Sequence, residues 1–125
     1  MDDLIFLQQI RAILSGPEKW TQGRMAKSAD GGVAIPTTEK ACCWCVMGAA
    51  AAVCPDGHTG KNGAEDNGAR LARLLPGLPE TDGATWYYSP WSKVIVWNDD
   101  PDTTFDMISA KLDQAIADLS TPAVA

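Results

Sequence analysis

An uninterrupted apolar run over residues 41–54 is the most distinctive hydrophobic pattern in the chain. It contains no charged side chain, and it is too short to cross a bilayer. Alanine and methionine favour helix, so we expect a helix within residues 39–54 that is buried on all sides. Thr37 or Thr38 is the expected N-cap, and the Pro-Asp-Gly sequence that follows the run is the expected stop.

Apolar residues at helical spacing predict three further helices around this one. They cover residues 2–14, residues 64–75 and the stretch from Thr103 to Leu119, in which Thr103 and Asp106 form a variant of the capping box. A shorter helix is expected from Thr21 to Ala29.

Two runs rich in β-branched and aromatic residues lie at 85–88 and 93–97. They are separated by Ser-Pro-Trp-Ser, which predicts a β-hairpin. The sequence thus predicts a mainly α (α+β) fold: a central buried helix wrapped by about three further helices, plus a small β-hairpin. At 125 residues, we expect a single domain that spans 1–125.

The net charge of −6 lies mostly in the second half of the chain, because residues 61–125 carry ten acids and five bases. Such a surface would be repelled by nucleic acid and by anionic lipid. The N-terminus lacks the basic region of a signal peptide, and no run is long enough for a membrane span. We therefore expect a cytoplasmic protein whose four cysteines are free thiols.

Four of the sulfur and imidazole side chains resemble a zinc set: Cys42, Cys45, Cys54 and His58. On one helix, however, Cys45 and Cys54 would lie roughly 13 Å apart along the axis, too far for one ion. A redox pair of Cys42 and Cys45 would require a preceding core strand. A thiolate at Cys54 would face the negative end of the helix dipole, which disfavours Cys54 as a nucleophile. We therefore predict neither a metal nor another cofactor.

An acidic turn around residues 98–106 offers carboxylates for a hard cation, but it lacks the spacing of a calcium-binding loop. Acids before a helix are ordinary capping residues, and we favour that interpretation.

The aromatic residues have two possible roles. Either all the tryptophans belong to the core, or some form a recognition surface, because Trp and Tyr dominate interface hot spots. In the second case we expect an aromatic centre with an acidic rim that binds a protein with a basic surface. The residues of this predicted patch are Trp86, Tyr87, Tyr88, Trp91, Asp99 and Asp100.

Three short motifs occur in a recognisable order. They are Trp20-Thr-Gln-Gly23, Trp44-Cys45 followed by Gly48-Ala49, and Val94-Ile-Val-Trp97-Asn98-Asp99 leading through Pro101 and Thr103 into the last helix. In this, the chain resembles a family of short bacterial and phage-encoded proteins known only as a domain of unknown function. The resemblance covers about residues 4–116, and it implies a compact helical domain without an established activity.

Our leading functional hypothesis is a small acidic protein that binds another protein stoichiometrically, as an accessory factor of a phage or mobile element that binds or inhibits a host protein. The sequence lacks a convincing nucleophile, base and orienting group, so we lean against an enzyme. The alternative is a pocket for a small ligand or for cysteine-dependent catalysis. It would be built from the motif residues Trp20, Thr21, Gln22, Cys45, Trp97, Asn98 and Asp99. A pocket predicts that these side chains converge, whereas an interaction protein predicts that they are buried or cap helices.

Overall fold

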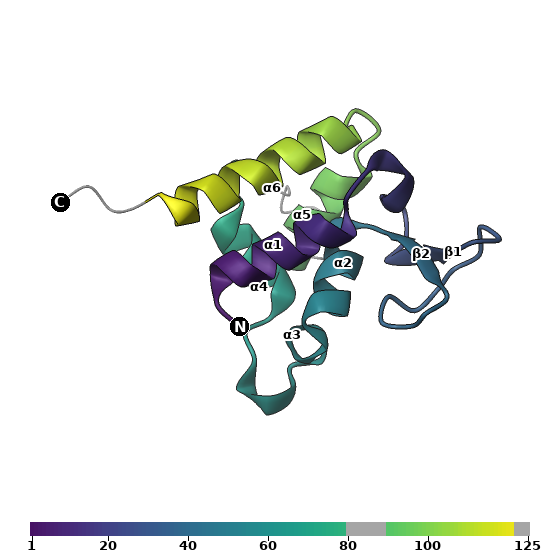
Figure 1. Cartoon of the computed structure of the whole chain (residues 1–125), viewed down its shortest axis with the longest axis horizontal. Helices are drawn as coiled ribbons and strands as arrows, with labels where there is room; N and C mark the ends of the chain where they lie inside the picture. The colour runs from purple at the N-terminus through teal and green to yellow at the C-terminus, as the bar shows by residue number, and fades with distance from the viewer. Residues whose placement is uncertain (80–89, 122–125) are drawn as a thin grey trace.

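The structure is a computed structural model, and it describes residues 1–79 and 90–121. The chain folds mainly into helices, with one small two-stranded sheet among the described residues (Figure 1). The elements in order are α1 (Asp3–Ile13), η1 (Pro17–Lys19), β1 (Ala26–Ser28), β2 (Ala41–Trp44), α2 (Val46–Val53), α3 (Pro55–Thr59), η2 (Lys61–Gly63), α4 (Asn67–Leu74), α5 (Pro90–Asp99) and α6 (Phe105–Ser120).

Helix α2 is the centre of the fold, and it contacts α1, α3, α4 and α5. Residues 46–51 are all buried, as expected for a helix without a polar face. The predicted central helix is therefore confirmed, but it begins at Val46 rather than near Glu39. Residues 41–44 instead form β2, and the N-cap is Cys45 rather than Thr37 or Thr38.

Strand β2 pairs antiparallel with β1, which corrects two predictions. Residues 26–28 are a strand, so the short helix predicted from Thr21 to Ala29 is wrong. The antiparallel pair among the described residues is formed by β1 and β2, whereas the hairpin was predicted over residues 85–97. Residues 26–28 and 41–44 form strands because their backbones pair with each other. Local β-propensity does not reveal such pairing.

Residues 93–97, predicted as a strand, belong to α5, and residues 85–88 lie outside the described residues. In α5 the buried residues are Val94, Trp97 and Asn98, which recur at the i, i+3, i+4 spacing of a helix. A short apolar run of this kind fits either a strand or a buried helix, and the strand interpretation was wrong.

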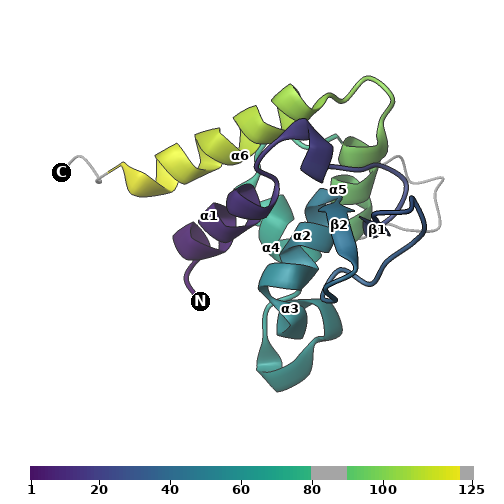
Figure 2. The same cartoon turned by 45° about the vertical axis from the view of Figure 1, so that its right-hand side comes forward.

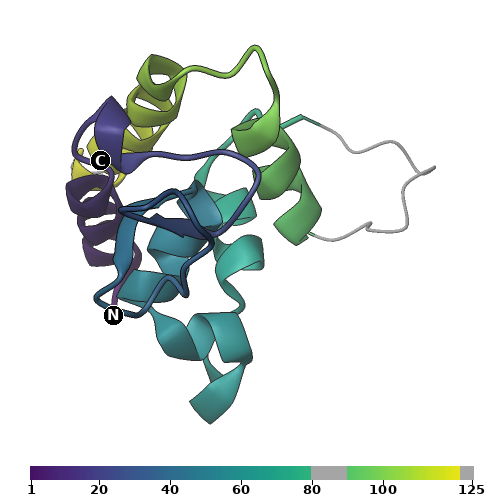
Figure 3. The ribbon, with the colours of Figure 1, turned by 90° about the vertical axis from the view of Figure 1, so that its right-hand side faces the viewer.

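The outer helices confirm the amphipathic patterns. Asp2 caps α1 by accepting a hydrogen bond from Ile5 N at 2.8 Å, and Thr104 rather than Thr103 caps α6. Figure 2 shows α6 lying along α1, while α3 and η2 form the opposite end of the molecule (Figure 3). The predicted Pro-Asp-Gly stop of the central helix lies at the start of α3.

An ion network joins the start of α1 to α4. Asp3 binds Arg70 at 2.9 Å and Arg73 at 2.8 Å, and Arg73 also binds Glu65 at 2.8 Å. Arg70 is buried, and its guanidinium lies 4.3 Å from the centre of the Phe6 ring. The network therefore combines ion pairing with a cation–π contact.

Across residues 1–79 and 90–121, none of the helices combines the length and the apolar character that a membrane span requires.

Candidate functional site

The amide of Asn98 is the centre of the polar site. It is only 1% exposed. Its Oδ1 accepts hydrogen bonds from Trp20 Nε1 at 2.8 Å and from Val46 N at 3.0 Å, and its Nδ2 donates to Thr21 O at 3.1 Å. One side chain at the end of α5 thus joins the loop after η1 to the first turn of α2. A buried amide that is satisfied in this way fixes one arrangement of the three segments.

A second layer of hydrogen bonds surrounds this amide. Gln22 Nε2 donates to Asn98 O and to Asp100 O, both at 2.9 Å. Asp99 Oδ1 accepts from Gly23 N and from Asn98 Nδ2, again at 2.9 Å. The Trp-Thr-Gln-Gly and Asn-Asp motifs, far apart in the sequence, therefore form one unit in space.

Cys45 lies beside this unit as the N-cap of α2. Its Sγ accepts a hydrogen bond from Gly48 N at 3.2 Å and lies 4.0 Å from Met25 Sδ. Burial raises the pKa of the Cys45 thiol to about 11, and the nearby Asp99 carboxylate adds to the rise. The thiol is therefore protonated at neutral pH and is a poor nucleophile.

A cavity of about 140 Å³ lies between these groups. It is lined by Gly23, Arg24, Met25, Cys45, Met47, Ile95, Asn98 and Asp99. The convergence predicted for a pocket is thus present for Cys45, Asn98 and Asp99. Trp20, Thr21 and Gln22 join them through hydrogen bonds rather than as cavity lining. Trp97 is buried in the core, with the ammonium of Lys111 5.8 Å from the centre of its ring.

Most polar groups of this site bond to one another, and they hold the loop after η1 against α2 and α5. We call this structural hydrogen-bonded unit the clasp. The Trp20 indole, the Asn98 amide and the Gln22 amide nitrogen all have partners inside the fold. The site offers no general base beside Cys45 other than Asp99, which raises the pKa of the thiol.

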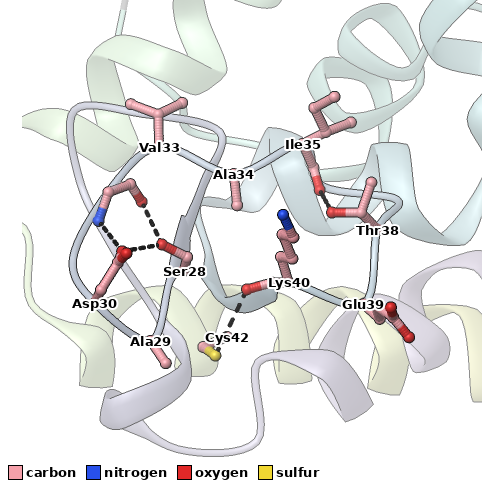
Figure 4. Close-up of a pocket in the computed structure, with 11 residues that line it drawn as sticks. Ser28, Ala29, Asp30, Val33, Ala34, Ile35, Thr38, Glu39, Lys40 and Cys42 are labelled. Atoms are coloured by element: carbon pink, nitrogen blue, oxygen red, sulfur yellow. Dashed lines mark hydrogen bonds between the residues drawn. The ribbon is translucent and has the colours of Figure 1, made fainter.

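A larger hollow lies elsewhere, inside the loop that joins β1 to β2. This groove has a volume of about 880 Å³ and an open mouth, and Figure 4 shows the residues around it. The lining is largely apolar, with Val33, Ala34 and Ile35 along one side and Lys40 and Thr38 among the polar residues. Sequence reasoning missed this groove, because the loop is neither periodic nor part of a motif.

The family comparison gives a clear result. The model of DUF6197, a family of unknown function, matches residues 2–118. The chain belongs to this family. Neither a comparison with curated proteins nor one with solved structures finds a match.

The predicted aromatic patch lies only partly in the described region of this DUF6197 chain. Trp86, Tyr87 and Tyr88 fall outside it. Trp91 is half-buried, donates from Nε1 to Asp66 Oδ1 at 2.7 Å, and lies 5.2 Å from the His58 ring between centres. Asp99 belongs to the Asn98 unit, while Asp100 is exposed. The patch as a binding surface stays a prediction.

The four cysteines of the DUF6197 chain are free and spread over different environments. Cys42 is exposed on β2, whereas Cys45 is buried, and Cys43 and Cys54 are partly buried. Within residues 1–79 and 90–121, no three His, Cys, Asp or Glu side chains lie close enough together to hold a metal ion.

Proposed function

We propose that this DUF6197 member acts stoichiometrically, by binding another protein in the cytoplasm, and that the groove of the β1–β2 loop is its binding surface. This proposal rests on which groups remain available at the surface for a partner. The motif residues direct their polar groups inward at Asn98, whereas the groove is open and bordered by exposed apolar side chains. Exposed apolar residues around a hollow are typical of interaction sites.

The chemistry of Cys45 supports binding rather than catalysis. A thiol with a pKa of about 11, which caps a helix and has only the Asp99 carboxylate beside it, is unsuited to attack a substrate. An accessory role in a phage or mobile element, including inhibition of a host protein, belongs to the proposal and rests on the family resemblance alone.

The test is affinity capture from the native host, followed by measurement of the complex mass by light scattering. We expect one partner in a fixed ratio. Val33→Asp should abolish capture, because it places a charge on the groove rim. Val96→Asp is the matched control, since Val96 is exposed on α5 away from the groove, and it should retain capture. A partner that binds both variants equally would refute the assignment to this surface.

A small-ligand role is the second candidate, because Cys45, Asn98 and Asp99 converge on the 140 Å³ cavity. Thermal-shift screening against small polar metabolites tests this role. A ligand that stabilises wild type but not an Asp99→Asn variant would favour it over protein binding. A ligand that stabilises both variants equally would bind elsewhere.

A further inference from the structure

Beside the groove, Val33 pairs with β1 in an isolated bridge whose outer edge is open. Ser28 N donates to Gly32 O at 2.9 Å, and Ala34 N donates to Ala26 O at 3.1 Å. These two bonds flank the antiparallel bridge between Lys27 and Val33. In such a pair the N–H and C=O of Val33 point away from β1. Neither group has a hydrogen-bond partner among the residues that the structure describes.

The side chains on this edge alternate in exposure. Val33 is 77% exposed and Ile35 is 66% exposed, the highest values among the exposed large hydrophobic residues of the described chain. Ala34 between them is buried. This alternation is that of a strand with one face open to a partner. The edge therefore offers both backbone hydrogen-bonding groups and apolar contacts.

The charged side chains that line the groove are Asp30, Glu39 and Lys40. Figure 4 shows the Glu39 carboxylate pointing away from the Lys40 ammonium. Lys40 forms no ion pair within the described residues, and Figure 4 shows its ammonium pointing into the space that the loop encloses. The Asp30 carboxylate, by contrast, bonds to Ser28 Oγ and to Gly32 N.

We propose that the Val33–Ile35 edge binds an extended segment of the partner protein by strand addition. The segment pairs its backbone with Val33, places apolar side chains at alternate positions against Val33 and Ile35, and carries a carboxylate that binds Lys40. Strand addition takes its affinity from the main chain and its specificity from alternate side chains. This inference rests on the proposed function and names the chemistry of its partner.

Two other occupants fit the observations less well. A second copy would bring two chains of net charge −6 together. The edge is also short for the contact area of a stable dimer. A nucleic acid would match Lys40, but the acidic remainder of the chain would repel it. Both alternatives are outcomes of the test.

The test begins with a random 12-residue peptide library displayed on phage, selected against the full-length protein. We expect enriched peptides to alternate apolar residues and to contain Asp or Glu. Their affinities are then measured by fluorescence anisotropy. Val33→Asp and Lys40→Glu should each weaken binding by roughly tenfold or more, as expected for residues at the centre of an interface. Val96→Asp and Lys19→Glu are matched controls that should stay within about twofold.

A backbone scan separates strand addition from other modes of binding. Each peptide nitrogen of the best peptide is methylated in turn, which removes one donor at a time. Val33 offers the one free carbonyl on this edge, because Ile35 O already accepts from Thr38 N and Thr38 Oγ1. Methylation of the peptide nitrogen that pairs with Val33 O should therefore abolish binding, whereas the two neighbouring nitrogens, whose N–H groups face away, should tolerate it. Equal sensitivity at all positions, or at none, would overturn the proposal.

The other possible outcomes of the peptide selection and of the host capture also test the two proposals. Selection that yields no peptide dependent on Val33 would overturn strand addition. Binding of a random DNA duplex or concentration-dependent dimerisation in sedimentation, lost in Val33→Asp, would assign the edge to those occupants and overturn it as well. If the captured host partner still requires Val33 while no extended peptide binds, the proposed function stands and this inference fails. If no partner is captured, the proposed function itself fails.

Discussion

Trp20 and Asn98 lie 78 residues apart in the sequence and are joined by a hydrogen bond of 2.8 Å between the indole nitrogen and the amide oxygen. The same oxygen accepts from Val46 N, so one atom connects three segments. The relationship explains why two polar motifs flank an otherwise apolar core. Their main role in the fold is to fix the loop after η1 against α2 and α5.

Removal of the Asn98 amide should therefore destabilise the whole fold. Asn98→Ala leaves the Trp20 indole and Val46 N without their buried acceptor, and we expect a loss of about 2–4 kcal/mol in the free energy of unfolding. Urea denaturation measures it. Gln114→Ala is the control, because the exposed Gln114 side chain bonds to the exposed Asp118 one turn along α6, and its removal should change little. An Asn98→Ala variant as stable as wild type would mean that the unit is not a clasp.

A second prediction concerns Gly48. A β-carbon at this position would collide with the carbonyl oxygen of Met25. Gly48→Ala should thus lower the free energy of unfolding by about 1–3 kcal/mol, although alanine normally stabilises a helix by about 1 kcal/mol relative to glycine. The sign of the change is the test. A higher denaturation midpoint would show that the loop moves away from α2 without cost.

The same contact shows what the sequence could and could not reveal. The neighbour that requires glycine at position 48 is the backbone of Met25, which is distant in sequence, and the Trp44 indole donates to Pro36 O. The amphipathic helices were predictable because each carries its own periodic pattern. The start of α2 was not, because pairing of residues 41–44 with residues 26–28 is set by long-range contacts.

The candidate site was predictable to a similar extent. The motifs singled out Trp20, Gln22, Asn98 and Asp99, and these residues do meet. That these residues hydrogen-bond to one another could not be predicted, because it depends on the three-dimensional fold and not on their spacing in the sequence. The β1–β2 groove gave no sequence signal, since a Val-Ala-Ile stretch between two glycines and a proline also fits an ordinary loop.

The ion network predicts a dependence of stability on pH. Hydrogen bonds from Arg73, with a further contribution from Arg70, lower the pKa of Asp3 from 3.8 to about 2 against the opposing effect of burial. A lowered pKa in the folded state stabilises the protein above pH 4 and loses this effect as the pH falls from about 4 toward 2. The stability difference between wild type and Asp3→Asn should therefore be constant near neutrality and shrink over that range.

Chemical denaturation at a series of pH values measures this difference. Asp102→Asn is a suitable control, since the exposed Asp102 carboxylate forms no ion pair among the described residues, and its difference from wild type should vary less with pH. Because the network is partly exposed, added salt should reduce the contribution of Asp3. A difference that grows as the pH falls would contradict the assignment.

Thiol accessibility gives a third kind of test. Cys42 is exposed, whereas Cys45 is buried and has a raised pKa of about 11. Iodoacetamide at pH 8 should alkylate Cys42 readily and Cys45 only after unfolding, because the thiolate is the reactive form. Peptide mass spectrometry of native and urea-treated samples quantifies both sites. Rapid labelling of Cys45 in the native protein would instead support the alternative of cysteine-dependent catalysis.

Trp91 provides the last prediction, because its two possible roles lead to different results. As an exposed anchor it would contribute to partner binding and little to folding. In the structure its ring lies so close to Gly68 that a β-carbon there would collide with it, and its Nε1 donates to Asp66. We therefore expect Trp91→Ala to lower the free energy of unfolding by about 2–4 kcal/mol, through lost packing between α4 and α5.

Trp91→Phe keeps an aromatic ring without the donor and should recover most of that loss. Melting temperature and partner affinity are measured on both variants. If Trp91→Ala melts like wild type and loses the partner, the aromatic patch rather than the β1–β2 groove is the binding surface.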